Sequence, residues 1–401
     1  MSGGPQHVLV VGAGLGGIRT VEQLRQAGYE GRISLVGAEP HPPYDRPPLS
    51  KQLLAGEWEP ERVSLKDDAA LEDLGVRLYL GLPAVALRPG EVELADGSVL
   101  AADAIVLATG VVARRLPGQP DSVHTLRTLD DALALRAELE TAESLVVVGA
   151  GFIGAEVAST AAAKGVAVTV LEAAPVPLAR GLGEEVGGLA GRLLTEGGVE
   201  LRLGARITGF TDGGVELADG TRVAADVVVV GIGGVPDLEW LADTGLDLSD
   251  GVPCDAGGRV VGLDGVWALG DAAAWEGPDG VRHRHEHWTS TSDQATVVAR
   301  AITGTEAPPE TVPYVWSDQF GLKIQVIGEP AAADAVEQLL GEGLDGGPIK
   351  GTVVGYFADD RLVAVAGFGA ARYVVRYRAL LQEKASRGAA RELAASFTRK
   401  A

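Results

Sequence analysis

The chain has 401 residues, a net charge of −21 at neutral pH, 46% hydrophobic residues and a single cysteine, Cys254. This length predicts two or three domains, and the composition excludes a disordered or fibrous protein. The acidic balance argues against nucleic-acid binding, and one cysteine excludes an intrachain disulfide, a CxxC redox pair and a Cys-ligated iron–sulfur cluster.

No apolar run reaches about 18 residues, so we expect no membrane span. The first residues lack the basic stretch of a signal peptide and lead directly into a strand. We therefore expect a soluble protein that stays in the cytoplasm.

The first elements form a strand–turn–helix–strand unit, the opening of a doubly wound sheet. A hairpin with Asp96-Gly97 at its turn and a further buried strand follow this unit. The predicted strands are 8–11, 33–36, 91–94, 99–100 and 104–108, and the predicted helix is 17–27.

The same pattern then occurs a second time. VVGAGLGG, which begins at Val10, matches VVGAGFIG from Val147, and ELADGSVLAADAIVLATG from Glu93 matches ELADGTRVAADVVVVGIG from Glu216. This duplication predicts two dinucleotide-binding domains built on one plan. Its second copy comprises strands 144–148, 166–171, 214–217, 222–223 and 226–230, and helix 152–164.

The rest of the chain begins with a strand at 266–269 and a helix at 291–302, for which Thr289, Ser290 and Thr291 offer N-caps. Residues 305–309 read as a linker. Strands at 323–327, 352–357 and 362–367 and helices at 331–340 and 372–387 then predict a small α+β domain. The expected fold class is α/β: two Rossmann-like dinucleotide-binding domains plus this C-terminal domain.

The first glycine-rich turn, 12–17, is a GxGxxG between strand and helix. Gly12 permits the tight turn, Gly14 lets the backbone approach a pyrophosphate, and Gly17 permits close helix–sheet packing. The helix N-terminus adds N–H groups for the anion. We expect a dinucleotide here, with Glu39 on its ribose; a turn without ligand and a surface carboxylate are the alternatives.

The second turn, 149–154, repeats GxGxxG, and Glu172 lies 23 residues after Gly149, close to the spacing of a ribose-binding carboxylate. The two residues after Glu172 are alanines, so a 2′-phosphate would meet a carboxylate and no neighbouring cation. The second turn should therefore prefer NADH, although Arg180 could reach the site and leaves NADPH open.

Asp271 directly follows a buried strand, and a helix comes later in the chain. A carboxylate at that place is typical of a group that binds the ribityl chain of FAD; the alternative is a turn Asp that caps a helix. Because the first turn and Asp271 flank the second unit, we expect a discontinuous FAD domain, 1–114 with 236–311. NAD would bind at 115–235, and 312–401 would form the C-terminal domain.

Two stretches make the sequence specific: PYDRPPLSK at 43–51 and WSDQ at 316–319. With Ala108-Thr109-Gly110, GFIGAE at 151–156 and Leu269-Gly270-Asp271, they resemble the FAD-dependent ferredoxin reductases of bacterial haem-thiolate monooxygenase and Rieske dioxygenase systems, over nearly the whole chain. The FAD-side set is then Gly12, Gly14, Gly17, Glu39, Arg46, Lys51, Thr109, Gly110, Asp271, Trp288 and Trp316. The NAD-side set is Gly149, Gly151, Gly154, Glu172 and Gly233.

The resemblance implies that Arg46 and Lys51 line the flavin, with Lys51 near N5 and Glu156 paired to it as the second catalytic residue. A cation beside N5 would stabilise the anionic reduced flavin, and a carboxylate would hold that cation in place. A solvated Lys and a helix-surface Glu are the alternatives. Trp316 is expected against the isoalloxazine on the electron-exit side; the alternative is a half-buried core Trp.

Three histidines precede Trp288 at 283, 285 and 287. We reject a metal site because no further Cys or carboxylate set is placed to complete it. The stretch instead matches the Glu-x-Trp segment before the flavin helix of the resembled family.

The resemblance thus implies an NADH-dependent ferredoxin reductase: hydride passes to FAD, then single electrons to a separate 2Fe-2S ferredoxin. Reduction of rubredoxin or a quinone, and a flavoprotein that senses NADH, remain alternatives. Disulfide reductases of similar layout need a cysteine that PYDRPPLSK lacks. Residues 370–401 hold eight Lys or Arg and two Glu, which favours docking of an acidic ferredoxin there or simply a solvated basic face. We expect a monomer.

Overall fold

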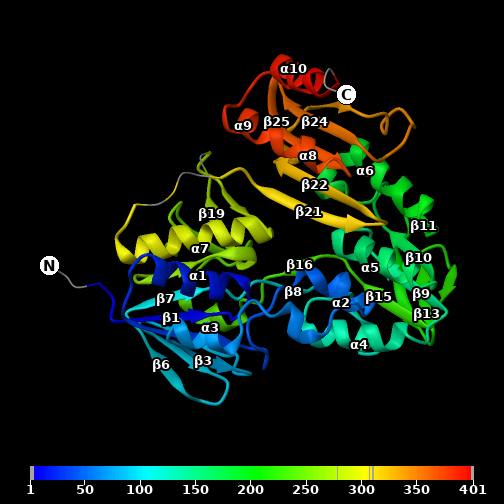
Figure 1. Ribbon diagram of the computed structural model, residues 1–401. Helices are drawn as coiled ribbons and strands as arrows, with labels where there is room; N and C mark the ends of the chain where they lie inside the picture. The colour runs from blue at the N-terminus through cyan, green and yellow to red at the C-terminus, as the bar shows by residue number, and fades with distance from the viewer. Residues whose placement is uncertain (1–3, 278, 307, 309–310, 399–401) are drawn as a thin grey trace. The chain divides into compact units, whose positions relative to one another are not determined.

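The computed structural model describes residues 4–277, 279–306, 308 and 311–398 (Figure 1). The chain divides into two compact units, each built from three segments. Unit 1 comprises Met1–Asp45, Glu61–Val112 and Gly234–Thr311. Unit 2 comprises Arg46–Pro60, Ala113–Gly233 and Val312–Ala401. The assignment of 46–60 to unit 2 is not apparent from the sequence, and the three-domain division stays a prediction.

Unit 1 is centred on a parallel five-stranded sheet of order β18-β7-β1-β2-β3. Its strands are β1 (His7–Val11), β2 (Arg32–Gly37), β3 (Val76–Leu80), β7 (Ala104–Leu107) and β18 (Val266–Ala268). Helices α1 (Leu15–Gln26) and α7 (Trp288–Thr303) pack side by side on one face (Figure 1). Alternate residues of β1 enter different cores: Val8 and Val10 face these helices, whereas Leu9 and Val11 face the opposite layer.

Smaller elements complete unit 1, among them an antiparallel meander, a mixed three-stranded sheet and single helical turns. The sheets contain β4 (Ala84–Arg88), β5 (Glu91–Leu94), β6 (Val99–Ala101), β17 (Val252–Cys254), β19 (Ala273–Glu276) and β20 (Arg282–Arg284). The short helices are η2 (Pro60–Val63), α3 (Asp68–Asp73), η3 (Glu239–Thr244) and η4 (Gly270–Ala272); β8 (Val112–Ala113) pairs with β16 (Gly234–Val235).

Unit 2 contains the second copy of the plan, which confirms the predicted duplication. Its parallel sheet has the order β11-β10-β9-β15, and an antiparallel meander again follows. The strands are β9 (Ser144–Val148), β10 (Ala167–Glu172), β11 (Glu200–Leu203), β12 (Ile207–Thr211), β13 (Gly214–Leu217), β14 (Arg222–Ala224) and β15 (Val227–Val230). The helices are η1 (Pro47–Ser50), α2 (Gln52–Ala55), α4 (Leu129–Leu139), α5 (Phe152–Ala163) and α6 (Ala179–Glu196).

The C-terminal part of unit 2 is an antiparallel sheet of order β21-β22-β25-β24-β23. Helix α6 packs on one face, and the last helices cover the other. The strands are β21 (Tyr314–Gln319), β22 (Leu322–Gly328), β23 (Ala335–Leu340), β24 (Thr352–Ala358) and β25 (Arg361–Phe368). The helices are η5 (Pro330–Ala332), α8 (Ala371–Val374), η6 (Val375–Tyr377), α9 (Arg378–Gln382) and α10 (Arg387–Thr398). The expected fold class is confirmed.

Three local predictions were wrong. Residues 331–340 are not a helix: a single turn precedes strand β23, whose ladder with β24 outweighs the helix propensity of its Glu, Gln and Leu residues. The predicted helix at 372–387 consists of three short helices that end before Lys384, where φ is +49°. The residues predicted as N-caps, 289–291, lie inside helix α7, which begins at Trp288 with His287 as its N-cap. Thr291 Oγ1 donates to His287 O from within the helix. Two residues of the predicted linker, 307 and 309, lie outside the described residues.

Candidate functional site

The first glycine turn lies between β1 and α1 in unit 1. Gly12 has φ +114°, and a Cβ there would lie 2.2 Å from Ala108 O; a Cβ on Gly17 would lie 1.9 Å from Gly12 O. At Gly14 a Cβ would meet nothing within 4 Å. No side chain among the described residues caps α1 at Gly14. Packing therefore requires the outer glycines, while the middle one leaves open space beside uncapped N–H groups, which fits a pyrophosphate.

Residues at the carboxyl ends of β2 and β7 lie at the same edge of this parallel sheet. Glu39, after β2, accepts a hydrogen bond from the buried Tyr44 hydroxyl. Thr109 follows β7, and its backbone N would lie 2.8 Å from a Cβ added at Gly12. The next residue, Gly110, has φ +70°. The structure thus gathers these predicted residues around the first turn.

Asp271 lies in η4, directly after β18 at the same edge of the sheet. Its neighbour Gly270 donates its N–H to the buried Gln294 Oε1 of α7 at 2.8 Å, and Arg284 Nη1 donates to Asp271 O at 2.8 Å. Helix α7 and strand β20 therefore both hold this turn in place.

Trp288 is the first residue of α7. Its indole Nε1 donates to Asp45 Oδ1 at 2.8 Å, and the Arg19 guanidinium lies 5.6 Å from the ring centroid. Asp45 belongs to the PYDRPPLSK stretch, so one end of that stretch is fastened to the start of α7 within unit 1. Sequence reasoning did not predict this contact.

The second glycine turn, in unit 2, reproduces the geometry of the first. Gly149 has φ +99°, with a would-be Cβ 2.5 Å from Gly231 O, and a Cβ on Gly154 would lie 2.1 Å from Gly149 O. Gly151 is the N-cap of α5, where its would-be Cβ approaches only Gly231 O, at 3.9 Å. The second turn has the same open middle position and fits the same class of ligand.

Glu172 ends β10, and both of its carboxylate oxygens accept backbone N–H groups. Oε2 accepts from Ala150 N and Oε1 from Ala174 N, each at 2.7 Å. Gly233, with φ +98°, lies past the end of β15, and its O accepts from Arg114 N at 2.9 Å. The carboxylate is therefore fixed against the second glycine turn, as the ribose-binding assignment requires.

The predicted pairing of Lys51 with Glu156 is confirmed. Lys51 Nζ lies 2.7 Å from Glu156 Oε2 and also donates to Pro47 O at 2.9 Å. Glu156 is only 3% exposed. Two serine hydroxyls that we did not predict also donate to it, Ser50 to Oε2 and Ser317 to Oε1, each at 2.5 Å. Both serines lie in the specific motifs, but the sequence does not reveal which group their hydroxyls contact.

Arg46 and Trp316 also belong to unit 2. Arg46 Nη1 donates to Arg127 O at 2.5 Å. The half-buried Trp316 of β21 stacks on Tyr314, with ring centroids 5.8 Å apart and planes at 20°, and Lys323 Nζ lies 5.9 Å from its ring. These contacts fix the tryptophan ring on one side of β21.

Cys254 and the three histidines are the remaining groups with redox or metal chemistry in the sequence. Cys254 is fully buried, and desolvation, with a smaller contribution from Asp255, raises the pKa of its thiol to about 12. Such a thiol is not a reactive redox group. Across the described residues, no cluster of three or more His, Cys, Asp or Glu is arranged to hold a metal.

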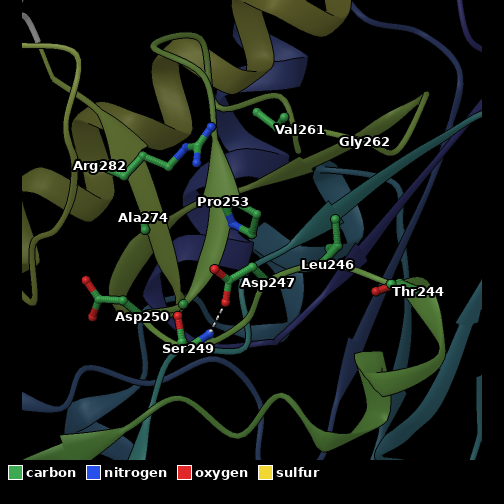
Figure 2. Close-up of a pocket in the computed structure, with 12 residues that line it drawn as sticks. Thr244, Leu246, Asp247, Ser249, Asp250, Pro253, Val261, Gly262, Ala274 and Arg282 are labelled. Carbon is green, nitrogen blue, oxygen red and sulfur yellow. Dashed lines mark hydrogen bonds between the residues drawn. The ribbon is translucent and has the colours of Figure 1, made fainter.

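A pocket of about 440 Å³ opens elsewhere in unit 1, beside β17, β19 and β20 (Figure 2). Ser249 N donates to Asp247 Oδ1 at 3.1 Å on its floor, and the Ser249 hydroxyl and N–H lower the pKa of the Asp247 carboxyl. Thr244, Asp250 and Arg282 also belong to the polar part of the lining (Figure 2). None of the predicted cofactor residues is among those that line it, so this pocket is not the predicted cofactor site.

Comparison with known proteins assigns both parts of the chain. Residues 6–295 match the family model described as pyridine nucleotide-disulphide oxidoreductase, and residues 314–399 match the one described as reductase C-terminal. The chain belongs to the pyridine nucleotide-disulphide oxidoreductase family. Among the residues that the structure describes, no helix is long and apolar enough to cross a membrane.

Two curated relatives and one solved structure illustrate the similarity. The ferredoxin reductase component of chlorobenzene dioxygenase from Cupriavidus sp. (strain PS12) is 40% identical over 80% of each chain. A rubredoxin–NAD(+) reductase of Ectopseudomonas oleovorans is 36% identical over 80% of this chain and 86% of the relative. The reductase in the covalent putidaredoxin reductase–putidaredoxin complex superposes with a TM-score of 0.90 at 30% identity, over 94% of this chain and 93% of the other.

Proposed function

We propose that this chain is an FAD-dependent NADH:ferredoxin oxidoreductase that supplies single electrons to a 2Fe-2S ferredoxin of an oxygenase system. The observation that carries the proposal is its similarity to ferredoxin reductase components of dioxygenase systems, at 40% identity over 80% of both chains. The two glycine turns and the pairing of Lys51 with the buried Glu156 support it. The iron–sulfur cluster belongs to the partner, because one cysteine cannot ligate it.

The chain's own residues would bind the two nucleotides at the two glycine turns. In unit 1 the open position at Gly14 and the uncapped α1 would receive the FAD pyrophosphate, with Glu39 and Asp271 on the sugar portions. In unit 2, Gly151 and Glu172 would receive NADH in the same way. FAD, when bound, supplies the conversion of a two-electron hydride donor into one-electron steps.

Arg46 would line the flavin, and Lys51, Glu156 and Trp316 keep the roles that the family pattern implies. Lys51 would place an ammonium group where negative charge develops on reduction, and Glu156 would hold that group in position. Trp316 would lie on the electron-exit side, with its ring fixed by Tyr314. These roles are proposals that rest on the motifs.

We further propose a preference for NADH over NADPH. Two backbone N–H groups fix the Glu172 carboxylate, so it cannot rotate away from an added 2′-phosphate without losing both hydrogen bonds. The alanines that follow supply no cation for that phosphate. The fixed negative charge would therefore accept ribose hydroxyls and repel a phosphate.

The partner is proposed to be an acidic ferredoxin that docks on the C-terminal basic region. Among the described residues, Arg372 and Arg376 lie exposed around Val375, whose side chain is 55% exposed. Arg391, by contrast, is paired with Glu337 at 2.7 and 2.8 Å. A partly apolar, positively charged surface fits an acidic protein partner. The monomeric state and cytoplasmic location stay predictions.

Turnover of the FAD-loaded protein with NADH or NADPH, through a 2Fe-2S ferredoxin coupled to cytochrome c, tests the proposal. We expect cytochrome reduction that requires ferredoxin and is much faster with NADH. Rapid NADH oxidation that ignores ferredoxin would contradict it and favour another acceptor; a rubredoxin is the first to try, because one relative is named a rubredoxin reductase. A long-lived reduced state that passes electrons to no acceptor would favour the NADH sensor.

A further inference from the structure

A continuous chain of hydrogen bonds, buried as far as Glu156, joins the C-terminal sheet to Lys51 within unit 2. Gln319 Nε2 donates to Ser317 Oγ at 3.0 Å, Ser317 Oγ to Glu156 Oε1 at 2.5 Å, and Lys51 Nζ to Glu156 Oε2 at 2.7 Å. Gln319, Ser317 and Glu156 are each at most 3% exposed. Water therefore has little access to replace the two links from Gln319 to Ser317 and from Ser317 to Glu156.

The order of donors fixes the direction of the hydroxyl. Ser317 Oγ accepts the Gln319 amide N–H, so its own hydrogen is left for Glu156 Oε1. That bond occupies one carboxylate oxygen and leaves Oε2 for Lys51 and Ser50. A charge-assisted hydrogen bond from a buried hydroxyl is strong and directional, so it restricts rotation of the carboxylate.

Strand β21 presents different residues on its two faces. Ser317 follows Trp316 in this strand, so the two side chains point to opposite faces of the sheet. The Ser317 face packs against α5, which carries Glu156, and the Trp316 face carries Tyr314 and Lys323. The strand thus reaches the Lys–Glu pair from the side away from its tryptophan.

We propose that Ser317 is a positioning residue for Lys51 and acts through Glu156. By holding Oε1, it orients Oε2 towards the ammonium group and stops the carboxylate from engaging Lys51 with both oxygens. The first strand of the C-terminal domain thereby sets how strongly the Lys51 charge is felt at the flavin. This inference rests on the proposed function, which puts Lys51 beside the flavin.

The alternative is that Ser317 merely fastens the sheet to α5. The chain offers a matched control, because Ser159 lies one turn along α5 from Glu156 and its Oγ accepts the Phe320 N–H at 2.7 Å. Both serines make contacts between α5 and the β21–β22 hairpin. Of these two serines, only Ser317 donates to Glu156. Ser159→Ala therefore removes a comparable contact between α5 and the hairpin but leaves the Lys51–Glu156 pair intact.

The test compares wild type with Ser317→Ala, Ser317→Thr, Gln319→Met and Ser159→Ala in the full-length FAD-bound protein. Two quantities are measured: the midpoint potential of the bound flavin, and the rate of its reduction by NADH in a single turnover. Ser317→Ala should lower the potential and slow reduction roughly tenfold, because the Lys51 charge becomes more completely neutralised. Ser317→Thr, which keeps the hydroxyl, should restore both values.

Gln319→Met keeps the side-chain volume but removes the donor that directs Ser317, so it should shift the potential in the same direction by less. It also provides an answer if Ser317→Ala does not fold. Wild-type potential and rate in both Ser317→Ala and Gln319→Met, or an equal shift in Ser159→Ala, would overturn the inference. The potential is measured without NADH or ferredoxin; an FAD-bound wild type that NADH does not reduce would instead contradict the proposed function.

Discussion

The carboxylate of Glu172 links the end of β10 to the second glycine turn through two backbone hydrogen bonds. Such a group stabilises the turn and, in its proposed role, would present a fixed negative charge to the ribose of NADH. Sequence spacing alone predicted its place, because parallel strands bring their carboxyl ends to one edge of the sheet. The hydrogen bonds to Ala150 and Ala174 hold the charge in place, which is why the proposed site would repel a 2′-phosphate.

Replacing Glu172 by Gln should therefore reduce discrimination between the nucleotides. An amide offers one acceptor oxygen and no charge, so we expect kcat/KM for NADH to fall about tenfold and that for NADPH to rise or stay unchanged. Steady-state kinetics with a small dye acceptor measure both. Glu196→Gln, on the half-exposed end of α6, is the control and should change neither. An unchanged NADH-to-NADPH ratio in Glu172→Gln would argue against the ribose assignment.

His7 is a buried titratable group at the start of β1, with Nδ1 2.7 Å from Ala101 O and Nε2 2.9 Å from Ser34 Oγ. Burial, together with the Arg32 charge, lowers the pKa of its imidazole. Below about pH 6.5 the unfolded chain then takes up a proton before the folded one does. The stability associated with neutral His7 is complete above that pH and is lost as pH falls towards the lowered pKa.

We therefore expect the free energy of unfolding of wild type to fall more steeply on acidification than that of His7→Gln. The variant should be less stable at pH 8, since it loses packing and hydrogen bonds, and the gap should narrow by pH 5.5. Urea unfolding at both values tests this. A gap of constant size would show that His7 does not contribute to the pH dependence.

At the scale of single residues, sequence reasoning found the groups that belong to motifs and missed their partners. Lys51 and Glu156 were paired correctly because both lie in stretches typical of one family. Ser50 and Ser317 lie in the same stretches, yet nothing in the sequence says that their hydroxyls point at Glu156, because that depends on how η1, α5 and β21 pack.

At the scale of elements, the strand–turn–helix units are determined locally and the C-terminal sheet is not. Gly154 allows α5 to pass so close to the turn that a Cβ would lie 2.1 Å from Gly149 O. The third glycine of GxGxxG is typical of this close approach, so the sequence predicts it. Strand β23 has a helix-like composition, and only its ladder with β24 makes it a strand. Pairing with another strand cannot be recognised from the residues of β23 alone.

Gly154→Ala should accordingly destabilise the second half of the chain by about 1–3 kcal/mol, because backbone atoms must shift to admit the methyl group. NADH affinity should fall with it. Gly188→Ala, in the interior of α6 with nothing within 4 Å of the added Cβ, is the matched control. It should stabilise by about 0.5–1 kcal/mol. Denaturant unfolding and NADH titration measure both; equal effects of the two substitutions would contradict the close-packing argument.

At the scale of the whole molecule, the duplication and the charge distribution were readable from sequence, and the assignment of segments to units was not. The stretch PYDRPPLSK divides between the units: Asp45 contacts Trp288 in unit 1, whereas Lys51 contacts Glu156 in unit 2. A single motif thus reaches both halves of the duplicated plan, which spacing along the chain cannot reveal. The charge distribution leads to a prediction about the partner.

The protein carries −21 overall, so an acidic ferredoxin is repelled by most of the surface and attracted only where positive charge gathers. If it docks around Arg372 and Arg376, salt should weaken that local attraction, since the Debye length falls from about 10 Å at 0.1 M to about 3 Å at 1 M. We expect kcat/KM for ferredoxin to fall roughly tenfold between 0.05 and 0.5 M salt, while NADH oxidation with a small neutral dye changes less than about twofold.

Arg376→Gln locates the docking surface in the same experiment. It should lower kcat/KM for ferredoxin about threefold at low salt and approach wild type at high salt, because screening removes what the substitution removed. Arg222→Gln on β14 changes the net charge equally at an exposed position outside the C-terminal region and is the control. Equal salt slopes for ferredoxin and dye, or equal effects of the two substitutions, would place the ferredoxin somewhere other than this basic surface.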